Sequence, residues 1–248
     1  MAEEADRRGI RYIATGHYAR VTERDGLYYI ATPQSVARDQ SYMLYRLGQD
    51  ILERLCLPLG EFDKDEIREM ARALNLSCAE APDSQEICFI PDGDYPAFIQ
   101  NRGITGLAGR FSGPQGEDLG PHKGVLHYTV GQRRGIGIAL GKPVFVQSIL
   151  PNGDVRLGYG GEEYAPGMLV RDIVTADGKP LLPGKEYRVK IRSRDKAVPC
   201  QVEDTSEPNT ARVRFNTPER APAPGQSAVF YTQDNRVAGG GFIRSIME

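Results

Sequence analysis

The stretch Tyr187-Arg188-Val189-Lys190-Ile191-Arg192 alternates apolar and basic residues along its whole length. Successive side chains of a β-strand point to opposite faces, so the apolar residues of such a strand share one face and the basic residues share the other. Ala211-Arg212-Val213-Arg214-Phe215 repeats the pattern. Short alternating segments separated by turns run from about residue 161 to 248. This spacing is typical of a small β-barrel or sandwich.

The basic faces of these two segments have two interpretations. If the segments form neighbouring strands, Arg188, Lys190 and Arg192 lie in one basic stripe with Arg212 and Arg214. The stripe is either a solvated face that protects a sheet edge or a surface that contacts the phosphate backbone of a nucleic acid.

The composition limits the class of protein. The 248 residues carry 31 Lys+Arg and 33 Asp+Glu, a formal net charge of −2 that excludes a uniformly basic nucleic-acid coat but allows a local basic face. The 28 glycines and 17 prolines favour many turns over a helical bundle. No CxxC pair occurs among the four cysteines, which excludes a zinc ribbon or a thioredoxin-type motif. The sequence has neither a signal-peptide pattern nor an 18-residue apolar run, so we expect no membrane partner and a cytoplasmic location.

The first third alternates helix and strand, which is typical of an α/β sheet. The predicted strands are 10–15, 18–23, 27–32 and 87–90, and the predicted helices are 2–8, 41–51 and one opening at Asp63. Asp25-Gly26 predicts a hairpin turn, and Glu66 completes a capping pair with Asp63. Since a sheet rarely starts with the end of a helix, we expect further sequence upstream.

The middle of the chain is rich in glycine. We expect a helix over 94–102, hairpin-like turns at 112–116, and strands over 144–150 and 155–157. The loop Gly131–Gly137 places three glycines around Arg133 and Arg134. Glycines let a backbone approach a ligand closely, and arginine pairs with phosphate, so the loop is either an ordinary turn or a phosphate contact. Its spacing is not that of a dinucleotide site.

Three positions are candidates for chemistry. Cys88 stands in an apolar run, where a cysteine is usually a small core residue, but it follows polar residues at the edge of an α/β crevice, where ligands lie. His17 ends a strand and either caps the loop or contacts a substrate. Asp39 heads a predicted helix as a cap, which leaves Gln40 without an explanation.

Six motifs occur in a fixed order along the chain. They are Ile13-Ala14-Thr15-Gly16-His17-Tyr18-Ala19-Arg20, Asp39-Gln40-Ser41-Tyr42, Leu57-Pro58-Leu59-Gly60, Asp83-Ser84-Gln85-Glu86-Ile87-Cys88-Phe89-Ile90, Tyr128-Thr129-Val130-Gly131-Gln132-Arg133-Arg134-Gly135 and Pro224-Gly225-Gln226-Ser227-Ala228-Val229-Phe230-Tyr231. From about residue 9 to the end, the chain resembles tRNA-specific 2-thiouridylases (MnmA, also called TrmU).

The resemblance implies an α/β + β fold in three parts. Residues 1–90 would be the remainder, the C-terminal part, of an adenine-nucleotide α-hydrolase-like (PP-loop) α/β adenylation domain. Residues 91–160 would form a small central tRNA-binding domain, and residues 161–248 a C-terminal β-barrel.

The resemblance also implies a reaction, the ATP-dependent 2-thiolation of the wobble uridine of tRNA. ATP, with Mg²⁺, would adenylate the C2 oxygen, and a cysteine persulfide on Cys88 would deliver the sulfur. Gly16 matches a nucleotide-contacting glycine. The positions that match tRNA contacts are His17, Arg38, Asp39, Gln40, Arg192, Ser193 and Gln226. The implied partners are the tRNA anticodon loop and a sulfur-relay or cysteine desulfurase donor protein.

The chain departs from the family pattern at several points. The Ser-Gly-Gly-x-Asp-Ser phosphate loop and the cysteine that forms a disulfide with the persulfide cysteine would lie upstream of Met1. We therefore expect this chain to be inactive alone, and the alternative function is a non-catalytic RNA-binding fragment. Ala81 replaces a common lysine, and Ser193 replaces a common aromatic residue.

Overall fold

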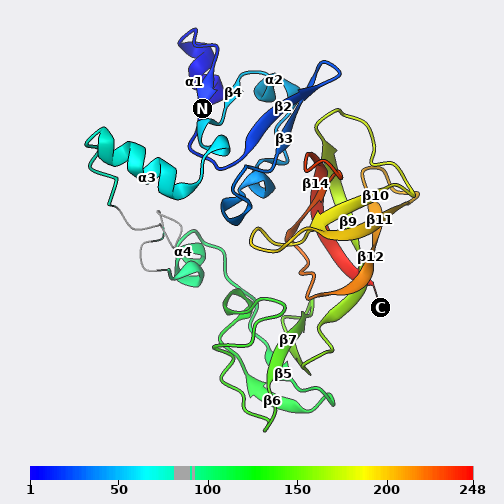
Figure 1. Cartoon of the computed structure of the whole chain (residues 1–248). Coiled ribbons are helices and arrows are strands. Elements are labelled where there is room, and N and C mark those ends of the chain that lie inside the picture. Colours follow the sequence, from blue (N-terminus) through cyan, green and yellow to red (C-terminus); the bar gives the residue numbers. More distant parts are fainter. Residues whose placement is uncertain (81–89, 91–92, 248) are drawn as a thin grey trace. The chain divides into compact units, whose positions relative to one another are not determined.

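The computed structural model describes residues 1–80, 90 and 93–247 (Figure 1). The chain divides into two compact units. Unit 1 comprises Met1–Ala81, Pro166–Thr217 and Pro224–Glu248, and unit 2 comprises Pro82–Ala165 and Pro218–Ala223.

Unit 1 contains a closed barrel of six strands in the order β10-β11-β12-β9-β14-β13. The strands are β9 (Tyr164–Thr175), β10 (Glu186–Lys190), β11 (Val198–Asp204), β12 (Ala211–Arg220), β13 (Ser227–Tyr231) and β14 (Val237–Met247). Tyr187, Val189 and Ile191 are buried in the barrel core, as the alternation predicts. Of the two all-β architectures that the sequence allows, the barrel is therefore the one formed.

The two basic segments are not neighbours in this barrel. β11 pairs with β10 on one side and with β12 on the other, so it separates them. Arg212 and Arg214 on β12 form ion pairs across to Glu203 on β11, at 3.6 and 2.6 Å. The expected continuous basic stripe is therefore wrong, because an intervening strand carries a carboxylate.

The N-terminal segment of unit 1 is built from short elements. They are α1 (Ala2–Arg7), β1 (Ile13–Ala14), β2 (Arg20–Arg24), β3 (Leu27–Ala31), α2 (Gln49–Leu52), β4 (Leu55–Cys56) and α3 (Lys64–Ala73), with 3-10 turns at Val36–Arg38, Ser41–Leu44 and Pro58–Glu61. β1 pairs in parallel with β4. Asp25 and Gly26 join β2 to β3 with φ values of 53° and 76°, which confirms the predicted hairpin turn.

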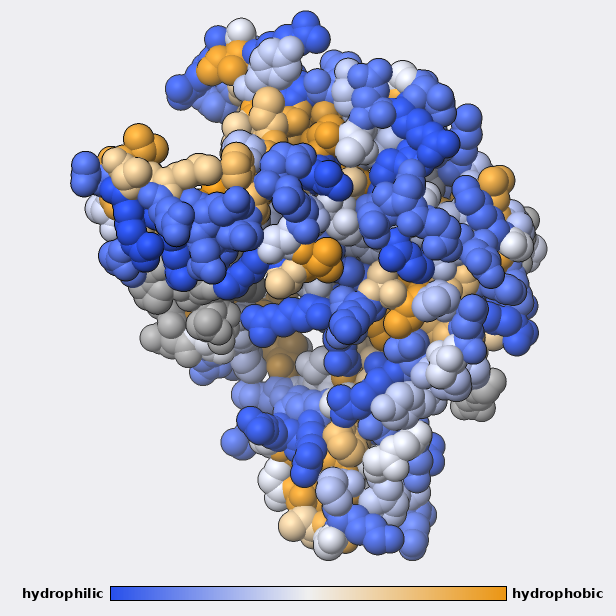
Figure 2. Space-filling model, in the orientation of Figure 1, coloured by the Kyte–Doolittle hydropathy of each residue, from blue (hydrophilic) through white to orange (hydrophobic). Residues whose placement is uncertain are grey.

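Two helix predictions have different outcomes. The helix expected over 41–51 is wrong in extent, because Gly48 is extended (φ −83°, ψ 172°) and separates a 3-10 turn from α2. At α3 the capping pair is confirmed, since the Asp63 side chain accepts hydrogen bonds from backbone N–H groups and Glu66 bonds back. The apolar face of α3 is largely exposed, with Met70 at 44% and Leu74 at 70%. The face of the molecule in Figure 2 is otherwise mostly hydrophilic.

Unit 2 holds a four-stranded sheet in the order β6-β5-β8-β7. Its elements are α4 (Tyr95–Gln100), β5 (Arg110–Ser112), β6 (Asp118–Pro121), β7 (Val144–Ile149) and β8 (Val155–Tyr159). Asp94 caps α4 by accepting a hydrogen bond from Ala97 N. β5 pairs with β6 across residues 113–117, which confirms the predicted turn. The core of this unit includes Phe111, Val146 and Leu157.

Several sequence predictions lie outside the described residues. The strand expected at 87–90 does so apart from Ile90, and with it Cys88. Ala81 also lies outside them. The observed α/β segment, small second sheet and closed barrel confirm the expected α/β + β fold class.

The motif Leu57–Gly60 packs closely against the motif Ile13–Arg20 at Gly60. A Cβ atom at Gly60 would lie 2.0 Å from the Ala19 carbonyl oxygen and 2.7 Å from Arg20 Cγ. Backbone cannot move aside as a flexible side chain can, so we expect Gly60→Ala to destabilise unit 1 by about 3 kcal/mol, as strong overpacking does. Urea denaturation followed by circular dichroism measures this change.

Gly16→Ala is the matched control for stability. Its Cβ would meet only Leu59 Cδ1, at an ordinary 3.6 Å. We expect a change within about 0.5 kcal/mol. Equal denaturation midpoints for the two variants would contradict the close approach at Gly60.

Candidate functional site

Residues 39–45 lie against the outside of the barrel, and we call this junction the 39–45 seam. Three hydroxyl groups fasten it to β13. Tyr42 Oη donates to the Ser227 carbonyl oxygen at 2.8 Å, and Tyr45 Oη lies 3.2 Å from Ser227 Oγ. Ser41 Oγ lies 3.0 Å from Tyr231 Oη, and both side chains are fully buried.

The seam turns the outer wall of the barrel into a second core. Ala228 and Phe230 of β13 point into the barrel, whereas Val229 and Tyr231 belong to a cluster with Tyr42 and other residues of the N-terminal segment. Gly240 on β14 leaves room for Tyr45, because a Cβ there would lie 2.5 Å from the Tyr45 ring. β13 is therefore buried on both faces.

An ion pair crosses this seam. Lys190 Nζ lies 2.5 Å from Asp39 Oδ2, and the two side chains are only 8% and 3% exposed. Asp39 Oδ1 accepts a hydrogen bond from Ser41 N at 2.9 Å, and the Lys190 ammonium lies 5.5 Å from the centre of the Tyr231 ring. Neither of the two interpretations that the sequence leaves open, a solvated face or a phosphate contact, holds for Lys190, because its charged end is buried and held by a carboxylate.

Arg188 lies on the same face of β10 as Lys190 and is half-buried. Its Nη2 donates to the Thr232 carbonyl oxygen at 3.0 Å and to Asn235 Oδ1 at 2.7 Å, in the turn between β13 and β14. Arg192 and Ser193 follow the end of β10 and are half-buried. Of the three basic residues of the segment 187–192, Arg188 and Lys190 therefore make structural contacts.

Gln40 ties the seam to the turn that follows β1. Its Oε1 accepts a hydrogen bond from Tyr18 N at 2.8 Å, and its own N donates to the Tyr18 carbonyl oxygen at 2.9 Å. Just before Tyr18 in the chain, Thr15 Oγ1 and His17 Nδ1 are 2.9 Å apart. This clamp explains the residue type at Gln40, which helix capping does not.

Unit 1 thus brings together most of the residues singled out from the sequence. Gly16 and His17 adjoin the Gln40 clamp, Asp39 lies in the ion pair, and Arg38 is exposed one residue earlier. The β10–β13 register pairs Lys190 with Val229. Because these strands are antiparallel, Arg192 and Ser193 leave the barrel beside the end of β13 that follows Gln226.

Two tyrosines of the seam have raised pKa values. Burial raises the pKa of Tyr42 to about 12, and the charge of Asp195 adds to the shift. Burial also raises the pKa of Tyr231 well above its usual value. Both phenols therefore stay protonated as hydrogen-bonding groups.

The described cysteines of unit 1 differ in burial. Cys200 lies in the barrel core, where burial raises the pKa of its thiol to about 12. Cys56 and Cys78 are free and exposed. Within the described part of the chain, no three His, Cys, Asp or Glu residues gather as a metal site, and no helix there is long and apolar enough to span a bilayer.

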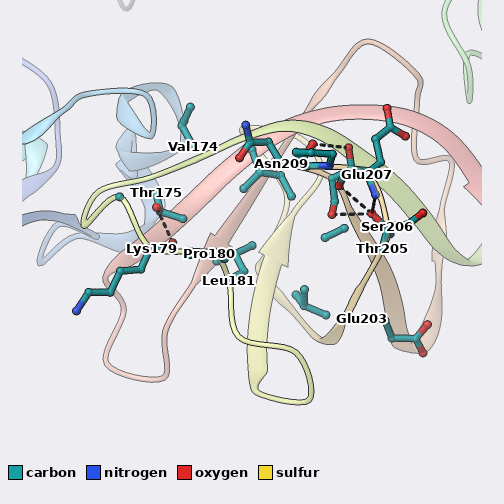
Figure 3. Close-up of a pocket in the computed structure, with 16 residues that line it drawn as sticks. Val174, Thr175, Lys179, Pro180, Leu181, Glu203, Thr205, Ser206, Glu207 and Asn209 are labelled. Atoms are coloured by element: carbon teal, nitrogen blue, oxygen red, sulfur yellow. Dashed lines mark hydrogen bonds between the residues drawn. The ribbon is translucent and has the colours of Figure 1, made fainter.

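A cavity of about 550 Å³ opens at one end of the barrel (Figure 3). It is lined by the end of β9, the 178–181 loop and the 205–210 turn. Its charged side chains do not converge: Lys179 and Glu207 extend in opposite directions, and Glu207 pairs with Arg244 at 2.6 Å. None of the predicted site residues that the structure describes lines it.

Three family models match the chain in succession. The tRNA methyl transferase HUP domain matches residues 1–92, the tRNA methyl transferase PRC-barrel domain 97–155, and the aminomethyltransferase beta-barrel domain 167–243. A protein of Lachnoclostridium phytofermentans named tRNA-specific 2-thiouridylase MnmA is 41% identical over 239 residues, 95% of this chain and 67% of its own length. The chain belongs to the MnmA/TrmU family.

Other members are similar to the same extent. The MnmA protein of Carboxydothermus hydrogenoformans is 43% identical over 94% of this chain, and that of Leptospira biflexa 40% identical over 98%. The chain spans 64% of the length of each of these two relatives.

Sequence reasoning missed the residues that build the seam of this MnmA-family chain, above all Lys190, Ser41 and Tyr231. One signal was available. Ala228-Val229-Phe230-Tyr231 is a continuous apolar run rather than an alternating one, which is typical of a strand buried on both faces.

Proposed function

We propose that this chain binds tRNA and serves the ATP-dependent 2-thiolation of its wobble uridine, with Cys88 as the sulfur-carrying residue. One observation supports the proposal most: the seam joins the 15–18 turn, Asp39-Gln40 and the end of β10 into one hydrogen-bonded surface. Two of these segments belong to family motifs, the 15–18 turn to Ile13–Arg20 and Asp39-Gln40 to Asp39–Tyr42. Rigid elements that hold such groups in register suit recognition of a folded RNA.

The proposed reaction has three steps. ATP, with Mg²⁺, transfers AMP to the C2 oxygen of the uridine and releases pyrophosphate. The terminal sulfur of a Cys88 persulfide then attacks C2, and AMP leaves with the oxygen. A second thiol breaks the remaining sulfur–sulfur bond and forms a disulfide, which a reductant must reopen. A cysteine desulfurase or relay protein would load the persulfide, in the reducing cytoplasm.

Gly16 fits a role near the nucleotide. Its φ is not in the left-handed region, and an added Cβ would make only one ordinary contact, with Leu59. The protein around it therefore has no need of a glycine, and close approach of a ligand supplies a reason for one. His17, Arg38, Gln40, Arg192, Ser193 and Gln226 are the proposed contacts to the tRNA anticodon loop. Asp39 acts through Lys190 and Ser41 in this proposal.

The experiment has two readouts on the 248-residue chain. tRNA affinity is measured by fluorescence anisotropy, and 2-thiouridine by mass spectrometry of digested tRNA after incubation with ATP, Mg²⁺ and a desulfurase with cysteine. We expect Arg192→Gln to weaken tRNA binding by about tenfold, the scale of one hydrogen bond to a charged group. Arg212→Gln, whose arginine already pairs with Glu203, is the matched control.

The same assay separates the two candidate functions. The Ser-Gly-Gly-x-Asp-Ser phosphate loop does not occur in these 248 residues, which favours RNA binding without catalysis by the chain alone. Binding with ATP-dependent 2-thiouridine supports the enzyme, and binding without 2-thiouridine supports the RNA-binding fragment. Absence of tRNA binding contradicts both.

A further inference from the structure

Loop 128–137 of unit 2 exposes two adjacent arginines, Arg133 and Arg134. The two ends of the loop are anchored, because Tyr128 and Ile136 are buried in the core of this unit. The guanidinium groups therefore lie between two fixed points of the chain.

Hydrogen bonds fix the backbone between these anchors. Gly131 N donates to the Val146 carbonyl oxygen at 2.8 Å, and Val146 N donates to the Gln132 carbonyl oxygen at 2.9 Å, which attaches the loop to β7. The Gln132 side chain then bridges the loop. Its Oε1 accepts from Thr129 N and its Nε2 donates to the Arg134 carbonyl oxygen, both at 2.9 Å.

The turns on either side of the arginines require glycine. Gly131, Gly135 and Gly137 have φ values of 84°, 76° and 78°, a region that other residues rarely adopt. The three glycines noted in the sequence thus serve the shape of this loop.

The two arginines also differ from their neighbours in charge balance. In unit 2, Arg110 and Arg220 pair with carboxylates at 2.7 and 3.1 Å. Arg133 and Arg134 form no ion pair within residues 1–80, 90 and 93–247. Like charges on neighbouring residues repel each other, and an anionic ligand that binds both would relieve this repulsion.

We propose that loop 128–137 binds the phosphodiester backbone of tRNA through Arg133 and Arg134. The planar guanidinium fork matches phosphate oxygens in a bidentate way. Because the loop is already ordered, little conformational freedom is lost when it binds. The proposal deepens the proposed function and rests on it, since tRNA is taken as the ligand.

The test is the salt dependence of tRNA affinity for the full chain and for Arg133→Gln/Arg134→Gln. Each phosphate contact contributes roughly 0.7–0.9 to the slope of log K against log salt concentration. We expect the slope of the double variant to be shallower by about 1.5, with affinity about tenfold lower at low salt. A second variant, Gln132→Ala, keeps both charges and loosens the loop, so we expect weaker binding with an unchanged slope.

Arg212→Gln/Arg214→Gln removes the same charge from two positions that share an ion pair with Glu203. An equal change of slope in this control would overturn the proposal, as would an unchanged slope and affinity in the loop variant. Loss of binding to the sulfur-donor protein, with tRNA binding intact, would assign the loop to an acidic protein surface and also overturn it. If the wild-type chain binds no tRNA, the proposed function itself has failed.

Discussion

Replacing Cys88 with serine is expected to abolish 2-thiouridine formation and to leave tRNA affinity within about twofold of the wild-type value. Under the proposed function, Cys88 holds the transferred sulfur in a sulfur–sulfur bond. A serine hydroxyl cannot hold a persulfide and is a far weaker nucleophile than a thiolate, so no sulfur reaches C2 of the uridine. Mass spectrometry of digested tRNA measures the product, in whichever preparation of the protein is active with the native cysteine.

The other cysteines supply controls of known environment. Cys56→Ser and Cys78→Ser remove exposed thiols and should retain thiolation. Burial raises the pKa of Cys200 to about 12, so its thiol stays protonated at pH 8. Thiolation that survives Cys88→Ser but is lost in one of the controls would assign the sulfur to a different residue.

The sequence predicts the individual strands of the barrel well because alternation is a local property. The burial of Tyr187, Val189 and Ile191 follows directly from it. Strand order is not local. Nothing within 187–192 or 211–215 indicates that β11 lies between them, and the expected basic stripe fails for that reason.

The seam could not be predicted from the alternation of apolar and polar residues along the strands. Alternation distinguishes the two faces of a strand, but it does not show whether another segment packs against the outer face. Lys190 looks solvent-facing beside Val189 and Ile191, but Asp39, 151 residues earlier, covers it. Asp39 is the acidic partner that Lys190 needs, but the sequence does not show that the two residues are neighbours. Only the three-dimensional structure brings residue 39 next to β10. Similarly, the amphipathic pattern of α3 correctly predicts a helix. It does not show whether another segment covers the apolar face, and in the structure this face is largely exposed.

Lys190→Met is expected to lower the free energy of unfolding of unit 1 by about 3–5 kcal/mol, because it leaves the Asp39 carboxylate buried without its partner. The double variant Asp39→Asn/Lys190→Met removes both charges and should be less destabilised than Lys190→Met alone. The difference from additivity measures the coupling of the pair. Urea denaturation of the wild type, Asp39→Asn, Lys190→Met and the double variant gives these values.

The same variants distinguish a direct contact between Lys190 and RNA from an indirect role, in which Lys190 holds other RNA-binding residues in place. If the ion pair holds the 39–45 seam in place, Lys190→Met weakens tRNA binding by displacing Gln40, which carries no charge, and the salt slope stays that of the wild type. A direct phosphate contact would instead make the slope shallower by roughly 0.7–0.9. Such a loss of slope, with stability unchanged, would contradict the buried pair. If Lys190 acts only by holding the seam in place, Asp39→Asn/Lys190→Met should bind tRNA more tightly than Lys190→Met and should also be more stable. Both properties would recover together because both depend on the same seam.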